Sequence, residues 1–259
     1  MVQMVFLFHY SKWINKFMLN SLNWITNNYF LKQKLNVPEF NSPIRKLTDS
    51  WQGIPVNGQK ILKGNITPKT SLDFNKFEFL RDLKSEGSIK ARTLTRSLVE
   101  GWIDEDYNLL SKEFRSEAIV SRITSWGFNY SWFAESGKLH FQKKLLHSIA
   151  LQTKYLELKL TNSKDHLEKI IIIKGIIVGQ SILYQEIENI YGLLDLLEDE
   201  IQFLINPDGG HKTRSPVLQI ELLRHLIEIR SVAAILKNID AENLNKQTIK
   251  MGQFCRSFQ

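Results

Sequence analysis

Hydrophobic residues recur at helical spacing along most of the chain from Asn75 onward, and this pattern restricts the fold more than any other feature. Between Ile190 and Leu204 the apolar residues lie three or four positions apart, with acidic residues such as Asp195 on the opposite face. Such a stripe is typical of a helix that packs on a partner. About eight ordinary-length helices fit between Asn75 and the end of the chain, and strand-like alternation is hard to find. The sequence therefore predicts an all-α fold. Similar stripes comprise Leu94, Leu98 and Trp102; Ile119, Ile123 and Trp126; and Leu222, Leu226, Ile229 and Ala233.

Helix boundaries can be read from the residues between these stripes. Gly87-Ser88 is suited to ending one helix and capping the next, and Ser215-Pro216 supplies a cap and a first helical residue. Helices joined so closely are expected to be antiparallel neighbours, and we expect residues 190–204 and 217–236 to form such a pair. Successive hairpins favour a solenoid or a closed ring of paired helices. Because no repeat of fixed period is visible, an incomplete (α/α) toroid is the preferred prediction.

The segment 36–74 differs from the rest, because it contains four of the six prolines. We predict a loop-rich, extended entry segment there, in which the hydrophobic residues between Trp51 and Leu62 (Trp51, Ile54, Ile61 and Leu62) form one or two strands across the helices. The expected organisation is amphipathic helices over 1–35, the entry segment over 36–74 and the toroid over 75–259, with 36–259 as one structural unit.

Composition and motifs exclude several classes of protein. The 259 residues carry a net charge of +7 and are 43% hydrophobic, so the chain can bury enough surface to exclude disorder. Cys255 is the only cysteine, which excludes an intrachain disulfide framework and a cysteine zinc site. Aliphatic runs such as Ile170–Ile173 are far shorter than the ~20 residues of a membrane span, and no secretory signal is visible. Phosphate-binding, dinucleotide and paired-histidine motifs are missing, so neither a cofactor nor a metal is expected.

The most informative stretch is Asn206–Pro216, which reads NPDGGHKTRSP. It resembles the Asp-Gly-Gly-His-x-x-x-Ser-Pro motif in the helical domain of the heparinase II/III-like polysaccharide lyases. Each motif is weak alone, but the order and spacing of several, between Trp51 and Phe258, make the resemblance specific. The other stretches similar to the bacterial branch of that family are Trp51–Gly53 with Gly58–Gly64, Phe79–Leu83, Leu98–Ile103 and Arg122–Trp126.

The resemblance implies an (α/α) toroid that in the family precedes a C-terminal β-sandwich domain, with the active site between the two. The chain is then expected to be a fragment or truncated form that needs the sandwich for activity. The implied activity is cleavage of a uronic-acid glycan by β-elimination, which neutralises the sugar carboxylate, removes the C5 proton and protonates the leaving oxygen. The family implies the periplasm or cell envelope, whereas the lack of a visible signal favours the cytoplasm.

The same resemblance assigns candidate catalytic residues. The Asn-His pair that neutralises the carboxylate in the family matches Asp165 and His166 here, and an ionised Asp165 would oppose the reaction. The tyrosine base of the family matches Leu218, and the histidine that follows it matches Gln219. His166 and His211 are therefore the remaining titratable candidates.

Substrate-binding candidates lie in the Asp-Gly-Gly-His loop. Arg214 is suited to binding a glycan carboxylate or sulfate bidentately, with Asp208 nearby and Lys212 acting at longer range. Arg214 is equally suited to pinning the loop to a neighbouring Glu. His211 either contacts substrate or holds the loop through backbone groups, and the second interpretation is slightly favoured.

A second group of candidates is aromatic. Trp126, Phe128, Tyr130 and Trp132 follow Arg122, and such residues stack on sugar rings or, more often, form part of a core. Arg122, Trp126 and Tyr130 are the substrate-binding candidates from this group.

Two other function classes stay open. One is a non-catalytic domain that binds an anionic polysaccharide or acts as a scaffold, which Leu218 and the missing sandwich favour. The other is a basic helical module that binds nucleic acid, although its helices would be lined with Lys and Arg, whereas the long helices here mix both signs. Anionic polysaccharide is therefore the expected partner, and nucleic acid is not.

Overall fold

The computed structural model describes residues 35–65, 74–105, 115–187, 190–236, 239 and 241–256. Within this part the regular structure is helical, and the β-type pairing consists of one isolated antiparallel bridge between Ile205 and His211. The all-α prediction is confirmed. The amphipathic helices predicted for 1–35 lie outside the described residues, apart from Leu35 itself. None of the described helices is long and apolar enough to cross a membrane.

The described part from residue 80 onward contains eight α-helices, which is the number that the periodicity predicts. Two elements precede them, the α-helix α2 and the 3-10 helix η2. The bounds are α2 Pro55–Leu62, η2 Phe74–Lys76, α3 Leu80–Glu86, α4 Ile89–Asp104, α5 Ser116–Phe133, α6 Leu139–Leu160, α7 His166–Leu183, α8 Ile190–Leu204, α9 Pro216–Ala233 and α10 Glu242–Arg256.

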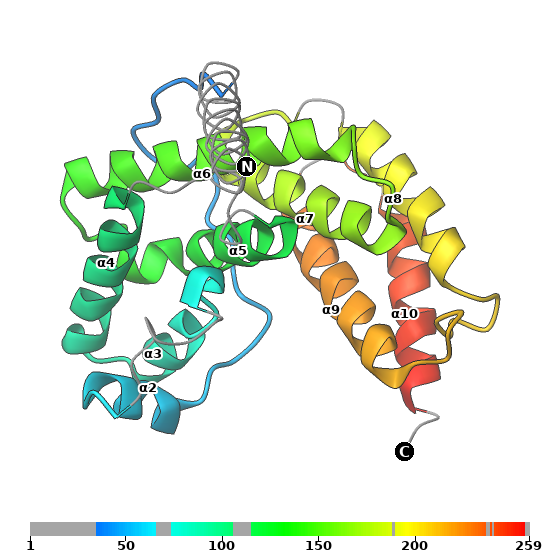
Figure 1. Ribbon diagram of the computed structural model, residues 1–259, viewed down its shortest axis with the longest axis horizontal. Coiled ribbons are helices and arrows are strands. Elements are labelled where there is room, and N and C mark those ends of the chain that lie inside the picture. Colours follow the sequence, from blue (N-terminus) through cyan, green and yellow to red (C-terminus); the bar gives the residue numbers. More distant parts are fainter. Residues whose placement is uncertain are drawn as a thin grey trace, which may run out of the picture.

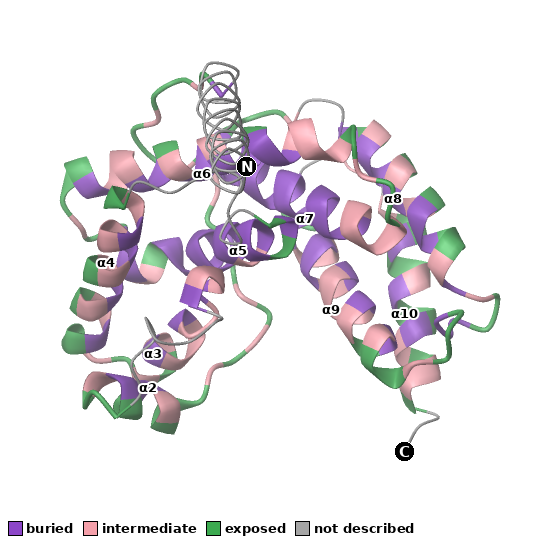
Figure 2. Ribbon diagram, viewed as in Figure 1, coloured by how far each residue is buried: buried purple, intermediate pink, exposed green. Residues whose placement is uncertain are grey.

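The helices form an arch around α7 (Figure 1). Helix α7 packs on α5, α6, α8 and α9, so it has neighbours on every side. Every residue from Ile170 to Leu183 is buried, as the continuous band along α7 in Figure 2 shows. A helix that is apolar all round has to be surrounded by protein. One arm of the arch contains α2, α3 and α4, and the other contains α8, α9 and α10.

The expected pairing of α8 with α9 is wrong as a description of their main contacts. Helix α8 packs chiefly on α7, while α9 packs on α10 and α7. Gln219 at the start of α9 connects α10 to the loop between α8 and α9, because its Nε2 donates hydrogen bonds to the carbonyls of Met251 and Gly209.

The predicted helix caps are confirmed. Gly87 ends α3 with φ of 82°, in the left-handed region that favours glycine, and its N–H donates to the Leu83 carbonyl at 3.2 Å. The Ser88 hydroxyl accepts a hydrogen bond from the Ala91 N–H at 3.1 Å. Ser215 caps α9 in the same way, with Pro216 as the first helical residue.

The strands predicted between Trp51 and Leu62 are wrong, because residues 55–62 form α2. Pro55 begins this helix, where its fixed φ and missing N–H cost nothing. Helix α2 packs on α3 so closely that a Cβ atom on Gly58 would overlap the Asp82 carbonyl oxygen. The rest of 35–54 is irregular backbone, as the proline content predicts.

Candidate functional site

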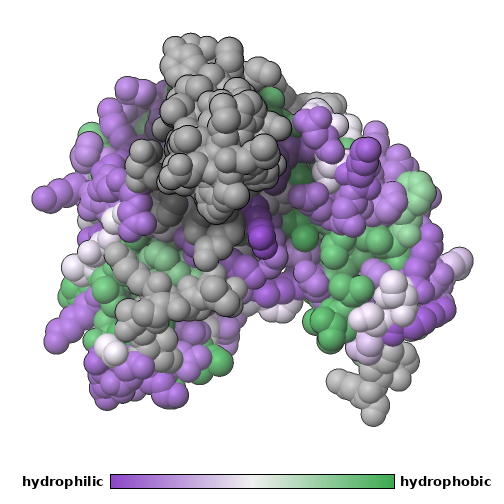
Figure 3. Space-filling view, viewed as in Figure 1, coloured by the Kyte–Doolittle hydropathy of each residue, from purple (hydrophilic) through white to green (hydrophobic). Residues whose placement is uncertain are grey.

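A cavity of about 440 Å³ lies between the arms of the arch, and η2, α3, α5, α7 and α9 all contribute to its wall. We call it the cleft. Figure 3 shows the molecule hollowed between the two arms, with hydrophilic residues at the roof of the hollow and a hydrophobic patch on the arm that contains α8–α10. The charged residues that line the cleft are Lys76, Glu78, Arg81, Glu117, Lys174, Glu221, Arg224 and Glu228.

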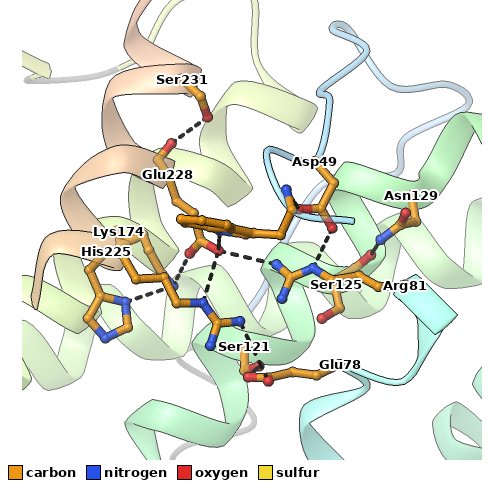
Figure 4. A network of polar contacts seen from close by, with 12 residues as sticks. Asp49, Glu78, Arg81, Ser121, Ser125, Asn129, Lys174, His225, Glu228 and Ser231 are labelled. Atoms are coloured by element: carbon orange, nitrogen blue, oxygen red, sulfur yellow. Dashed lines mark hydrogen bonds and ion pairs between the residues drawn. The ribbon is translucent and has the colours of Figure 1, made fainter. Parts of the chain in front are cut away.

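Glu228 on α9 is at the centre of a polar network (Figure 4). Its side chain is only 2% exposed. One carboxylate oxygen accepts a hydrogen bond from Lys174 Nζ at 2.7 Å. The other accepts from Trp51 Nε1 at 2.8 Å and from an Arg81 Nη atom at 3.2 Å. Burial alone would raise the pKa of Glu228, but the positive charges of Lys174 and Arg81 hold it below its ordinary value, so the carboxylate is ionised.

Two of the cations in this network are firmly held. Arg81 Nε lies 2.6 Å from an Asp49 carboxylate oxygen, and both side chains are at most 10% exposed. Lys174 sits within the apolar part of α7, and its burial lowers the pKa of the ammonium group while Glu228 opposes the shift. Because α3, α7, α9 and the entry segment each contribute a residue, the network ties both arms to the centre of the arch.

Arg224, the third cation, is held more loosely. Its guanidinium lies 3.6 Å from Glu78 and 3.8 Å from Glu228, and its side chain is 39% exposed. Glu78 is also partly exposed and accepts a hydrogen bond from the Ser121 hydroxyl at 2.8 Å. Long, partly exposed ion pairs contribute little stability. Arg224 can therefore exchange its partners at a lower cost than Arg81 or Lys174.

His225 lies beside Lys174, whose Nζ atom is 3.0 Å from His225 Nδ1. Burial and the charge of Lys174 lower the pKa of His225 to about 3, so the imidazole is neutral at neutral pH. The Nε2 atom is buried and has no hydrogen-bond partner among the described residues. The same is true of the Thr124 hydroxyl, which lines the cleft from α5.

The cleft contains ion pairs whose charges cancel and two buried polar groups without a hydrogen-bond partner among the described residues. Four carboxylates and four cations form the ion pairs at the cleft, so their formal charges cancel, and the two pairs of Arg224, with Glu78 and with Glu228, are the longest of them among the described residues. This arrangement can bind a polar ligand that carries a carboxylate, because the ligand can replace Glu78 at the guanidinium. No group of three or more His, Cys, Asp or Glu side chains in the described part of the chain is placed to hold a metal ion.

The residues predicted in the Asp-Gly-Gly-His loop lie outside the cleft, since none of residues 206–215 lines it. His211 is 4% exposed and accepts a hydrogen bond at Nδ1 from the Thr213 N–H. Its own N–H donates to Gln219 Oε1 at 2.5 Å, and Gln219 Nε2 donates to the Gly209 carbonyl at 3.0 Å. Burial lowers the pKa of His211. His211 thus holds the loop, which is the interpretation that the sequence slightly favours.

Arg214 and Asp208 form an ion pair at 2.7 Å on the surface of the same loop, and both side chains are about half exposed. The Arg214 guanidinium also lies over the Phe254 ring, 5.4 Å from its centroid. Asp208 accepts a further hydrogen bond from the Gly210 N–H at 2.9 Å. Arg214 is therefore engaged within its own loop, with Asp208 as its partner and not a neighbouring Glu. Lys212 is exposed to solvent.

His166 does not line the cleft and contacts α8 instead. Its Nδ1 atom is 2.5 Å from the Glu200 carboxylate, and its ring stacks on Phe203 with 4.4 Å between the ring centroids. Asp165 is the N-cap of α7, because its carboxylate accepts a hydrogen bond from the Glu168 N–H at 2.7 Å. The structure does not bring His166 and His211 together at the cleft.

The assignment of Arg122, Trp126 and Tyr130 to substrate binding is wrong. Arg122 and Trp126 have no exposed surface, and Tyr130 is 4% exposed. The Arg122 guanidinium lies 3.9 Å from the centroid of the Trp102 ring and donates a hydrogen bond to Gln152 at 2.7 Å. These side chains belong to the core, because α5 is covered by α7, α6 and the η2–α3 segment.

Sequence analysis does not identify the cleft residues, because each lies in a stretch whose pattern has another interpretation. Lys174 interrupts the Ile run of α7, and Arg224, His225 and Glu228 lie between the apolar positions of α9. One signal was available, since Trp51 and Arg81 belong to two of the motifs that carry the family resemblance.

Comparisons of the chain with protein-family models, curated proteins and solved structures find no match.

Proposed function

We propose that this chain binds a glycan containing uronic acid, and that the sugar lies in the cleft. The observation that carries the proposal is the state of Arg224, a partly exposed guanidinium at the cavity wall whose ion pairs with Glu78 and Glu228 are 3.6 and 3.8 Å long. Guanidinium binds carboxylate bidentately, so a uronate can take the place of Glu78. Lys174 and Arg81 keep Glu228 neutralised while this exchange occurs.

Two further features support the proposal. Val217 and Ile220 line the cleft and are 72% and 59% exposed, so they offer apolar surface to the C–H faces of sugar rings. The motifs that resemble heparinase II/III-like lyases also meet near the cleft, since Trp51 and Arg81 contact Glu228 on the helix that follows Ser215-Pro216. In this proposal the arch is an incomplete (α/α) toroid with the glycan on its concave side.

A β-elimination activity of the polysaccharide lyase type is the second candidate, because it is the activity that the family resemblance implies. In that reaction the C5 proton passes to a base, the C4–O bond breaks, a C4=C5 double bond forms and the leaving oxygen takes a proton. Neither His166 nor His211 lines the cleft, and no tyrosine is among its described lining residues, so the residues that the resemblance offers supply no base there. Glycan binding without elimination needs fewer groups and is the function that the geometry favours.

The test is titration of alginate and heparan oligosaccharides, with a neutral glucan for comparison, against wild type, Arg224→Ala and Arg214→Ala. We expect acidic oligosaccharides to bind and the glucan not to bind. Arg224→Ala should weaken binding about 10-fold or more, as expected when a charge-assisted hydrogen bond is lost, and Arg214→Ala should leave it unchanged. Absorbance of the unsaturated product in the same samples reports elimination.

Loss of binding in Arg214→Ala with full binding in Arg224→Ala would place the site at the Asp-Gly-Gly-His loop instead of the cleft. Equal binding of the neutral glucan would remove the role of the carboxylate. Because exposed charges are screened over roughly 8–10 Å at physiological ionic strength, binding through Arg224 should also weaken as salt rises.

A further inference from the structure

Two buried polar groups at the wall of the cleft have no hydrogen-bond partner among the described residues. They are Nε2 of His225 on α9 and Oγ1 of Thr124 on α5. Both residues line the same cavity. Buried polar groups in folded proteins nearly always have a partner, and a ligand in the cleft that reaches these two atoms would supply it.

The position of the proton on His225 follows from its neighbour. The Lys174 ammonium group is only a donor, and its Nζ lies 3.0 Å from His225 Nδ1, so Nδ1 has to accept that hydrogen bond. A neutral imidazole with an accepting Nδ1 carries its hydrogen on Nε2. Glu228 holds Lys174 in place at 2.7 Å, and Trp51 and Arg81 hold Glu228, so the tautomer depends on the whole network.

We propose that His225 is a neutral hydrogen-bond donor to the sugar bound in the cleft, with Nε2–H directed to a sugar oxygen and the Thr124 hydroxyl as a second contact. This inference rests on the proposed function and adds a specificity element to it. Arg224 binds the carboxylate, and the adjacent His225 binds a hydroxyl or ring oxygen of the same sugar. A neutral donor suits a neutral oxygen, whereas a third positive charge beside Lys174 and Arg224 would be repelled.

Binding at these atoms requires a movement of the cleft wall, because both atoms are buried. Arg224 is adjacent to His225 in sequence and is the most loosely held charged side chain of the network. Movement of Arg224 toward the sugar carboxylate would therefore accompany the exposure of Nε2.

The first test is nitrogen-15 NMR of the imidazole groups in the wild-type chain. We expect His225 to show a protonated Nε2 and an unprotonated Nδ1 at pH 7. Addition of an alginate oligosaccharide should shift the Nε2 signal, and addition of a neutral glucan should not. A protonated Nδ1, or an Nε2 signal that alginate leaves unchanged, would overturn the proposal.

The second test uses three variants and the same alginate oligosaccharide. His225→Phe removes the donor and should weaken binding about fivefold, the loss expected of one neutral hydrogen bond. His225→Gln keeps an N–H donor near the position of Nε2 and should restore most of the affinity. His147→Phe, at an exposed position on α6 that does not line the cleft, should bind like wild type.

The two proposals fail in different ways. Unchanged binding in His225→Phe together with weakened binding in Arg224→Ala would overturn the role of His225 and leave the glycan site in place. Unchanged binding in both variants, or no binding by wild type, would overturn the proposed function as well. If His225→Phe does not fold, as circular dichroism would show, the NMR titration of the wild-type chain decides the question.

Discussion

Lys174 Nζ lies 2.7 Å from the Glu228 carboxylate, and this contact joins α7 at the centre of the arch to α9 in one arm. Both side chains are at most 5% exposed. A buried ion pair adds little net stability over a well-packed apolar pair, because both charges lose their hydration. The pair instead determines how α7 and α9 are placed, since each charge can be buried only where the other is present. The pair thus fixes the position of the cleft walls.

Lys174→Met should lower the free energy of unfolding by about 3–5 kcal/mol, because it leaves the Glu228 charge buried without its lysine partner. The double variant Lys174→Met with Glu228→Gln should recover part of the loss. Lys46→Met is the control, since Lys46 pairs with Glu135 at an exposed site and should change stability by less than about 1 kcal/mol. Urea denaturation measures all three. Equal losses in Lys174→Met and Lys46→Met would contradict the role of the buried pair.

The low pKa of His225 makes stability depend on pH in a defined direction. The group has a pKa of about 3 in the folded chain and an ordinary value of 6.5 when unfolded, so between these values the unfolded chain binds more protons. Stability from neutral His225 is therefore fully present above pH 6.5 and is lost as the pH falls toward 3, by about 1.4 kcal/mol per pH unit.

The measurement is the urea midpoint of wild type and His225→Phe at pH 7, 6 and 5. Carboxylates with lowered pKa values, such as Glu168, lose stability in acid in both proteins and cancel in the difference. We expect the wild type to lose stability faster than the variant as the pH falls. Parallel curves for the two proteins would mean that His225 titrates normally.

Replacement of two glycines inside helices by alanine should change the stability of the chain in opposite directions. A Cβ on Gly58 in α2 would overlap the backbone of α3, so Gly58→Ala should destabilise the chain by about 1–3 kcal/mol and displace Arg81 from the cleft. Gly101 in α4 has open space at the Cβ position, and Gly101→Ala should stabilise the chain by about 0.5–1 kcal/mol. Thermal unfolding measures the change in stability of each variant. A stabilised Gly58→Ala would show that α2 does not pack closely on α3.

The sequence predicted the helices and their ends well, because local spacing determines both. The stripe of α8 and the caps at Gly87-Ser88 and Ser215-Pro216 lie where they were expected. Residues 55–62 were assigned wrongly, since a short apolar run fits a strand or a helix, and the close packing on α3 decides between them.

The site was harder to predict than the fold, because it is assembled from distant parts of the chain. Trp51, Arg81, Lys174 and Glu228 are far apart in sequence, and they meet because the entry segment, α3, α7 and α9 converge at one place in the fold. Arg122 was misassigned for the related reason that an arginine in an aromatic segment looks the same in sequence whether it is buried or exposed. Tertiary burial, which periodicity does not report, separates the two cases.

Replacement of Gln219 should show that the Asp-Gly-Gly-His loop contributes to the stability of the fold. Gln219 accepts a hydrogen bond from the His211 N–H and donates to the carbonyls of Gly209 and Met251, so Gln219→Leu leaves buried backbone groups without partners. We expect a loss of about 2–3 kcal/mol in the free energy of unfolding. Gln202→Leu, on the exposed face of α8, is the matched control and should have little effect. Urea midpoints compare the two variants, and similar midpoints would show that the loop does not depend on Gln219.

Because none of residues 206–215 lines the cleft, a folded Gln219→Leu chain should still bind alginate. This result would separate the role of the loop in stability from the binding site at Arg224.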